Sequence, residues 1–182
     1  MKYVLNGEQT DRLDFRLVNE DDFDTWLPLF QGDAIRFLGL NPELSAEEHG
    51  RYWFNKVFHR YENDLGGMNA LIERESGKLV GQCGLLVQEV QGDTLLEIGY
   101  SLLPDFRGKG YALEAAQKCK EEAFKRNYAQ ELISIVDINN HPSARVAQRN
   151  GMQIVRPHII YKDCEVNIFG IGREEWLSAQ KA

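Results

Sequence analysis

The sequence predicts an α+β, or mixed α/β, fold built around one central sheet, and three observations lead to this prediction. Two segments with helix-start signals lie in the first third of the chain. Three strand-like segments separated only by short turns come next, and strand and helix patterns then alternate toward the C-terminus. A chain of 182 residues can bury a substantial core, so we expect residues 1–182 to form a single domain.

The N-terminal part is expected to contain one strand and two helices. Residues 12–18 alternate apolar and polar side chains, as a strand does. Asn19 precedes a run of acidic residues and predicts the start of a helix, which Pro28 kinks or ends. Ser45 with Glu48 three residues later forms a capping-box signature, and a helix of about four turns is expected to follow it.

Three consecutive strands are predicted in the middle of the chain, at residues 68–75, 78–90 and 95–103. The turns that join them are too short for a parallel connection, so the three strands must form an antiparallel meander. Pro104 ends the third strand.

The C-terminal half is expected to alternate helices with strands. Apolar residues at helical spacing predict a long helix over residues 109–126. The remaining predicted elements are a buried strand at 131–138, a short helix at 143–150 that Gly151 ends, a hairpin of 152–157 with 159–171, and a last helical turn at 173–176.

The charge balance argues against some classes of partner. The formal net charge is −7 and the sequence pI is about 5.2, whereas nucleic-acid-binding proteins usually carry a basic face. We therefore expect no nucleic-acid partner. An acidic balance suits a cationic or amine partner better, although acidity also serves solubility. No stretch approaches the roughly eighteen apolar residues of a membrane span, and no membrane partner is expected.

The cysteines and histidines indicate a cytoplasmic protein that binds no metal. Cys83, Cys119 and Cys164 are odd in number and form no C-x-x-C pair, which fits a reducing compartment better than a disulfide framework. Cys119 falls on the apolar stripe of its predicted helix and is expected in the core. The four histidines show no ligand spacing, and the N-terminus lacks the apolar segment of a signal peptide.

A glycine-rich turn directly before the long predicted helix is the strongest sign of a binding site. Arg107, Gly108, Lys109 and Gly110 precede a helix whose first N–H groups have no internal partner. Glycines let an anion approach these groups, and the two cations add positive charge, so the turn predicts a pyrophosphate-binding loop. A simple tight turn with solvated cations is the alternative. The P-loop pattern and the third glycine of the dinucleotide fingerprint are both absent.

The segments EIGYSLLPDFRGKGYALEAA and VDINNHPSARVAQRNGM resemble the GNAT superfamily of acetyl-CoA-dependent N-acetyltransferases, and the RimJ/RimL-type branch in particular. The opening TDRLDFRLVNEDD and the closing REEW are similar to the same branch, so the resemblance spans nearly the whole chain. The superfamily signature Q/R-x-x-G-x-G/A is matched by Arg107, Gly110 and Ala112. Its N-x-x-[AS] element is matched by Asn140 and Ser143.

This resemblance implies a mostly antiparallel, twisted sheet that is splayed into a V and flanked by helices. Acetyl-CoA would lie in the V, between the strand that ends at Leu103 and the strand at 131–138. Its pyrophosphate would meet the backbone amides of Arg107, Gly108, Lys109, Gly110, Tyr111 and Ala112. Its pantetheine arm would pair with exposed backbone of Ser101, Leu102 and Leu103, as an added strand does.

The same resemblance suggests residues for the chemistry of acetyl transfer to an amine. It places general bases near Glu97, which would share one strand face with Gly99 and Ser101; a salt-bridged rim glutamate is the alternative. Asn140 would order the cofactor arm or a water, or would simply cap a helix. Ser143 would hydrogen-bond the leaving thiolate, or would cap the helix that follows.

One position departs from the family pattern. Much of the superfamily has a tyrosine four residues beyond the position of Ser143, and this chain has Ala147 there. Tyr100 and Tyr161 are remote substitutes. The aromatic residues of the second helix are expected to pack on the sheet, with a substrate wall as the alternative; they are Tyr52, Trp53, Phe54, Phe58 and Tyr61. Glu43, Glu47 and Glu48 could attract a cationic acceptor or could only favour the start of a helix.

The sequence therefore predicts an enzyme that transfers an acetyl group directly from acetyl-CoA to a primary amine. The acceptor is a protein N-terminus or a small-molecule amine. An enzyme that acetylates polyamines or antibiotics is one alternative, and a non-catalytic acyl-CoA-binding module is another. A monomer and a homodimer are both compatible with the sequence.

Overall fold

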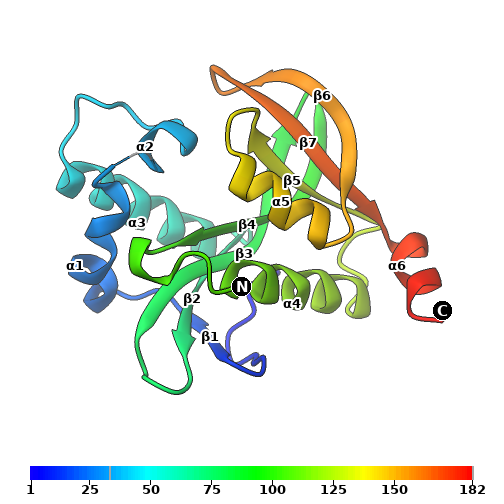
Figure 1. Ribbon diagram of the computed structural model, residues 1–182, viewed down its shortest axis with the longest axis horizontal. Helices are drawn as coiled ribbons and strands as arrows, with labels where there is room; N and C mark the ends of the chain where they lie inside the picture. Colours follow the sequence, from blue (N-terminus) through cyan, green and yellow to red (C-terminus); the bar gives the residue numbers. More distant parts are fainter. Residues whose placement is uncertain (33, 182) are drawn as a thin grey trace.

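The computed structural model describes residues 1–32 and 34–181, and a seven-stranded sheet runs through its centre (Figure 1). The strand order is β1-β2-β3-β4-β5-β7-β6. The strands are β1 Leu13–Leu17, β2 Gly66–Glu73, β3 Leu79–Val90, β4 Asp93–Leu102, β5 Glu131–Asp137, β6 Gln153–Tyr161 and β7 Cys164–Gly172. Every neighbouring pair is antiparallel except β4 and β5. The predicted mixed fold, with its antiparallel meander and mostly antiparallel sheet, is confirmed.

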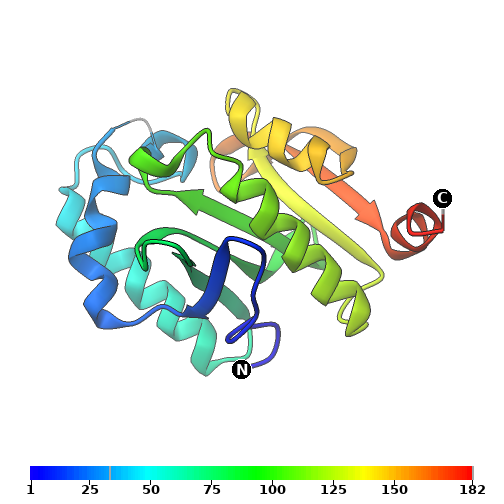
Figure 2. The ribbon, with the colours of Figure 1, turned by 60° about the horizontal axis from the view of Figure 1, so that its bottom comes forward.

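Helices cover both faces of this sheet (Figure 2). The α-helices are α1 Phe23–Trp26, α2 Ala34–Phe37, α3 Ala46–Glu62, α4 Tyr111–Lys125, α5 His141–Arg149 and α6 Arg173–Ala179. Short 3-10 turns stand at η1 Glu20–Asp22, η2 Leu27–Phe30 and η3 Pro104–Phe106. α1 and α3 pack with β2 in one apolar cluster, while α4 packs against β3 and β4 in another. The two clusters lie on opposite faces because neighbouring strand residues point to opposite sides.

The sheet opens between β4 and β5, as the V-shaped splay requires. These parallel strands pair at only two positions, Leu96 with Leu132 and Glu97 with Ile133. Beyond them no backbone pairing continues, and the Ser134 hydroxyl instead donates a 2.9 Å hydrogen bond to the Ile98 carbonyl oxygen. The strands diverge from this point, so one edge of β4 is left without a strand partner.

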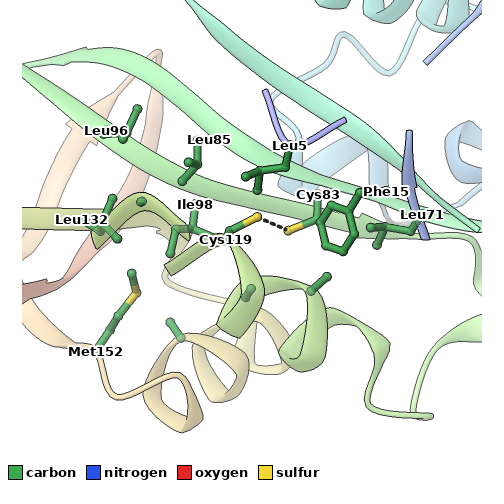
Figure 3. Packing of buried hydrophobic residues seen from close by; sticks show 14 of the residues in the cluster. Leu5, Phe15, Leu71, Cys83, Leu85, Leu96, Ile98, Cys119, Leu132 and Met152 are labelled. Carbon is green, nitrogen blue, oxygen red and sulfur yellow. Dashed lines mark hydrogen bonds between the residues drawn. The ribbon is translucent and has the colours of Figure 1, made fainter. Parts of the chain in front are cut away.

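The core beneath α4 accounts for two of the cysteines. Cys119 of α4 and Cys83 of β3 are fully buried, with their sulfur atoms 3.5 Å apart (Figure 3). Burial raises the pKa of the Cys119 thiol well above its ordinary value, and the contact with Cys83 adds to the shift. A neutral, inaccessible thiol is a poor nucleophile, and the prediction that Cys119 belongs to the core is confirmed.

The predicted start of α3 is confirmed, and one of its aromatic residues differs from expectation. Ser45 and Glu48 form the reciprocal hydrogen bonds of a capping box. Phe54 is buried in the core, but Tyr52 is 56% exposed, so the prediction that Tyr52 packs on the sheet is wrong. Tyr52 falls on the helix face that points away from β2 because it lies about half a turn from Phe54.

Two predicted boundaries also differ. α5 begins at His141 with Asn140 as its N-cap, so the expectation that Ser143 caps this helix is wrong. β6 does not end at Pro157 but continues through Tyr161, and its pairing with β7 shifts register on the way. The chain then turns at Lys162 and Asp163, which both have positive φ. The sequence did not reveal this turn because lysine and aspartate there replace the usual glycine or asparagine.

Candidate active site

A cleft of about 690 Å³ occupies the opening between β4 and β5. Its walls come from β4, β5, the glycine turn before α4, the start of α5, α3, the chain around α2, and the β6–β7 turn. Predicted site residues Glu97, Ser101, Leu102, Arg107, Gly108, Ala112, Asn140 and Ser143 all line it. The fold thus collects residues from positions 29 to 166 around one space.

The free edge of β4 presents main-chain groups to this cleft. The Ile98 carbonyl points across the opening, because it accepts the hydrogen bond from Ser134. Strand alternation then directs the backbone groups of Tyr100 and Leu102 to the same side, and those of Ser101 toward β3. Leu103 is 5% exposed, and its N–H donates to the Val80 carbonyl at 3.0 Å, which takes it away from the cleft. Tyr100 and Leu102 are therefore the positions at which a strand-like ligand can pair.

The glycine turn carries a row of unpaired N–H groups. In the described chain, no hydrogen-bond acceptor contacts the backbone N–H of any residue from 108 to 113. Gly108 and Gly110 adopt φ values of 76° and 86°, a region that L-residues rarely enter. Successive N–H groups in such a turn, at the start of a helix of 15 residues, form a concave anion site. This geometry is what the sequence-predicted pyrophosphate loop requires.

The side chains of the turn take different positions. Arg107 lines the cleft, and its Nε donates a 3.2 Å hydrogen bond to the Leu102 carbonyl. The Lys109 ammonium instead lies 5.0 Å from the centre of the Phe106 ring. The Tyr111 ring is buried in the core, so this residue offers the cleft only its backbone.

Arg12 supports the turn from outside, and the sequence analysis did not identify it. Its Nη1 donates a 3.0 Å hydrogen bond to the Lys109 carbonyl, and its Nε donates to Glu114 at 2.7 Å. Its guanidinium also lies 4.6 Å from the centre of the Tyr111 ring. These contacts hold the carbonyl outward, so that the N–H groups face the cleft. Local sequence gives no sign of this role, because the contacts bridge about a hundred residues.

Glu97 lies on the opposite part of the cleft wall, at the point where β4 and β5 separate. One carboxylate oxygen accepts a 2.6 Å hydrogen bond from the Gln88 side-chain amide, and the other faces the Ile135 N–H at 3.4 Å. Burial raises the pKa of Glu97, while these hydrogen bonds and the nearby charges of Arg60 and Lys56 partly oppose the shift. A carboxylate with a raised pKa is a better proton acceptor than an ordinary surface glutamate.

Positive side chains gather around Glu97. Arg60 is 8% exposed, and its guanidinium donates to the carbonyls of Leu65 and Val87 and to the Gln88 side-chain oxygen. Lys56 of α3 and Lys162 of the β6–β7 turn line the cleft itself. Burial lowers the pKa of Lys56, and the charges of Lys162 and Arg60 lower it further.

The acidic residues 43, 47 and 48 do not line this space. Glu47 pairs with Arg51, and Glu48 completes the capping box of α3. Their contacts therefore fit residues that favour the start of a helix better than residues that attract a cationic acceptor.

Two hydroxyl groups, one from β4 and one from α5, meet in the cleft. The Tyr100 hydroxyl donates a 2.9 Å hydrogen bond to the Ser143 carbonyl, and the Ser143 hydroxyl lies 3.3 Å from the Tyr100 oxygen. Burial raises the pKa of Tyr100 to about 12, so this phenol keeps its proton at neutral pH. The Asn140 side-chain oxygen accepts from the Ser143 N–H at 3.2 Å, which is the capping contact of α5.

The part of the chain that the structure describes contains no group of three or more His, Cys, Asp or Glu side chains that could hold a metal ion. None of its helices has the length and apolar character needed to cross a membrane.

The open sheet, the unpaired N–H groups and the carboxylate at the end of the cleft together make up the architecture of an acyltransferase. The family model "Acetyltransferase (GNAT) domain" matches residues 12–153. The chain therefore belongs to the GNAT acetyltransferase family and is an acyltransferase enzyme.

The chain is also similar to a bacterial relative in sequence and to solved structures in fold. The chain is 30% identical over 149 residues to YkkB of Bacillus subtilis (strain 168), covering 79% of this chain and 83% of that protein. An acetyltransferase from Agrobacterium tumefaciens str. C58 has the same fold, with a TM-score of 0.77 and 23% identity over 94% of this chain and 96% of the other. RimL, a ribosomal L7/L12 alpha-N-protein acetyltransferase solved with coenzyme A, has a TM-score of 0.72 and 16% identity, covering 93% and 98%.

Proposed function

We propose that this enzyme transfers an acetyl group from acetyl-CoA to a primary amine by direct attack. The observation that carries the proposal is the arrangement of the cleft. Unpaired N–H groups of residues 108–113 lie at one end, and the half-buried carboxylate of Glu97 lies at the other.

The cofactor side fits a nucleotide thioester. The backbone amides from Gly108 to Leu113, with the Arg107 side chain, would hold the pyrophosphate. The free backbone edge at Tyr100 and Leu102, next to Ser101, would pair with the amides of the pantetheine arm. Acetyl-CoA supplies an activated acetyl group at the end of that arm.

Each side chain near the reacting atoms then has one task. Glu97 accepts the proton that the amine loses, directly or through a water, while the amine nitrogen bonds to the acetyl carbon. The C–N bond forms first, and collapse of the resulting tetrahedral intermediate breaks the C–S bond. The hydroxyl of Tyr100 or Ser143 gives a proton to the departing sulfur and regains one from solvent, while Glu97 returns its proton to solvent. Asn140 holds the first turn of α5, and with it Ser143, in position. The buried Cys119 takes no part, and direct attack by the amine needs no acyl-enzyme.

The two acceptor classes make different demands on Glu97. Neutralising a lysine-type amine at pH 7.4 costs roughly 4 kcal/mol, whereas an α-amine costs only about half a kcal/mol. Burial raises the pKa of Glu97 in the direction that a useful base needs. The structural likeness to RimL supports a protein N-terminus as acceptor, and a small-molecule amine is the other candidate. A polyamine fits less well, because cations surround Glu97.

A panel assay tests the proposal. Thiol release from acetyl-CoA is followed with peptides, amino acids, polyamines and aminoglycosides, and calorimetry measures CoA binding separately. We expect CoA to bind and at least one primary amine to release thiol. CoA binding without release by any amine would instead support a non-catalytic acyl-CoA-binding module. If the folded protein did not bind CoA, the proposal that the glycine turn binds a pyrophosphate would be wrong.

A further inference from the structure

We propose that the acceptor carries a carboxylate in addition to its amine, and that the ammonium groups of Lys56 and Lys162 bind this carboxylate. The inference rests on the proposed function and names the acceptor class for the same site. Its starting point is that two lysines from separate elements line the cleft on the side of Glu97.

Neither lysine has an anionic partner among the side chains that the structure describes. Among residues 1–32 and 34–181, no ion pair or hydrogen bond involves the ammonium of Lys56 or of Lys162. By contrast, Lys118 and Lys125 on α4 both reach carboxylates. A charged group removed from water is costly unless it is paired, and Lys56 is half-buried.

A chain of contacts links Lys162 to Glu97, and Lys56 lies near both residues. The Lys162 ammonium lies 4.8 Å from the centre of the Tyr161 ring. The Tyr161 hydroxyl donates to the Gln88 side-chain oxygen at 3.1 Å, and the Gln88 amide donates to Glu97. Burial lowers the pKa of Lys56, and the nearby charge of Lys162 lowers it further. The cations are therefore part of the reaction site and not of the distant surface.

The local charge balance favours an anion. The charges of Arg60 and Lys56 act on Glu97, and Lys162 lines the same cleft, although the whole chain has a net charge of −7. Asp137 also lines the cleft, but its carboxylate caps the turn after β5 by accepting from the Asn139 N–H at 2.8 Å. A purely cationic acceptor would meet repulsion here. An acceptor with its own carboxylate would instead neutralise the lysines.

Two sources could supply this chemistry: a free amino acid, or a peptide N-terminus with an acidic side chain nearby. The test compares matched acceptors that differ by one charge. Alanine is compared with alaninamide. A tripeptide amide with glutamate in its second position is compared with the same peptide carrying glutamine. Thiol release is measured with the natural protein, Lys56→Met, Lys162→Met and the control Lys78→Met, an exposed lysine outside the cleft.

We expect the natural protein to prefer the carboxylate member of at least one pair by about tenfold or more in kcat/KM. Either cleft substitution should remove most of this preference while leaving the KM for acetyl-CoA unchanged, and Lys78→Met should retain it. Discrimination confined to the first pair identifies a free amino acid, and discrimination confined to the second identifies a peptide. Equal kcat/KM within both pairs, or a preference that survives both cleft substitutions, overturns the inference.

A binding experiment separates this inference from the proposed function. Calorimetry on the CoA-loaded protein compares N-acetylalanine with N-acetylalaninamide, and the acetylated forms of the two peptides, without any need for turnover. Binding of a carboxylate form that weakens in Lys56→Met supports the anion site even if no amine releases thiol. Turnover of neutral amines with no preference for a carboxylate in either assay would leave the acetyltransferase intact and reject the anion site.

Discussion

The side-chain amide of Gln88 donates a 2.6 Å hydrogen bond to the carboxylate of Glu97. The orientation of this amide is determined by its other end, because the Gln88 oxygen accepts from both Arg60 and Tyr161. With its oxygen occupied by two donors, Gln88 can present only N–H to Glu97. The contact stabilises the ionised carboxylate and so opposes the effect of burial on its pKa. Gln88 is therefore a positioning residue for the proposed base.

Gln88→Met tests this role. The substitution preserves length and removes the hydrogen bond, so the pKa of Glu97 should rise further. The acidic limb of the kcat/KM profile should then move to higher pH by roughly one unit, with the plateau less affected. Gln117→Met, at an exposed position on α4, is the control and should leave the profile in place. If kcat/KM fell equally at every pH and the acidic limb did not move, Gln88 would have only a structural role.

Glu97→Gln should separate activity from stability. Removing the base should lower kcat/KM by about a hundredfold near pH 7, and the variant should lose the pH limb that the carboxylate produces. The deficit should fall at high pH, since free hydroxide and a neutral amine compensate there, and it should also shrink below the pKa of Glu97, where the natural carboxylate is itself protonated. A pH response identical to that of the natural protein would remove Glu97 from the base role.

The same variant should be more stable at neutral pH. Burial raises the pKa of Glu97 in the folded state above its ordinary value of 4.5, so the unfolded chain releases this proton first. The contribution of Glu97 to the free energy of unfolding is therefore most favourable below pH 4.5 and falls as pH rises through the folded pKa. Glutamine at position 97 does not ionise, so the variant does not lose this stability as pH rises. The Tm of Glu97→Gln should exceed that of the natural protein at pH 7 to 8, and the gap should close near pH 4.

Gly108→Val tests the anion-binding turn. A Cβ at Gly108 would meet no protein atom within 4 Å, so bulk there projects into open space beside the N–H groups. We expect the KM for acetyl-CoA to rise about tenfold or more, because the side chain blocks the approach of the diphosphate. Positive φ adds strain of about 1–3 kcal/mol to folding.

Gly77→Val supplies the matched control for this strain. Gly77 has a φ of 69° and the same open surroundings, but it lies in the β2–β3 turn away from the cleft. The Gly77→Val variant should lose about as much stability as Gly108→Val but should keep the natural KM for acetyl-CoA. An equal KM for both variants would contradict the proposed cradle.

Tyr100→Phe and Ser143→Ala test the proton donor for the departing sulfur. Each single change should lower kcat by about tenfold with little change in the KM for acetyl-CoA. If the two hydroxyls act as a unit, the double variant should lose little more than either single one. Tyr128→Phe, outside the cleft, should keep full kcat. If the loss in kcat of the double variant equalled the product of the two single losses, the hydroxyls would not share one task.

Much of the fold followed from local signals. The alternation in β1 and the Ser45–Glu48 capping box predicted their elements, and the short turns between β2, β3 and β4 required an antiparallel meander. The anion-binding turn was also visible, because the glycine spacing and the start of α4 are adjacent in sequence. The β6–β7 turn was misplaced, because the positive φ of Lys162 and Asp163 has no local residue signature.

The sequence by itself determined the secondary structure, the glycine turn and the membership in an acetyltransferase family, since each depends on residues only a few positions apart. The tertiary structure alone decided which distant side chains meet. It brought Arg12 against Lys109, joined Gln88 to Glu97, and gathered Lys56 and Lys162 at the same wall of the cleft. The physical reason is that a pKa or a charge balance depends on distance and burial in space, and neither quantity is encoded by spacing along the chain.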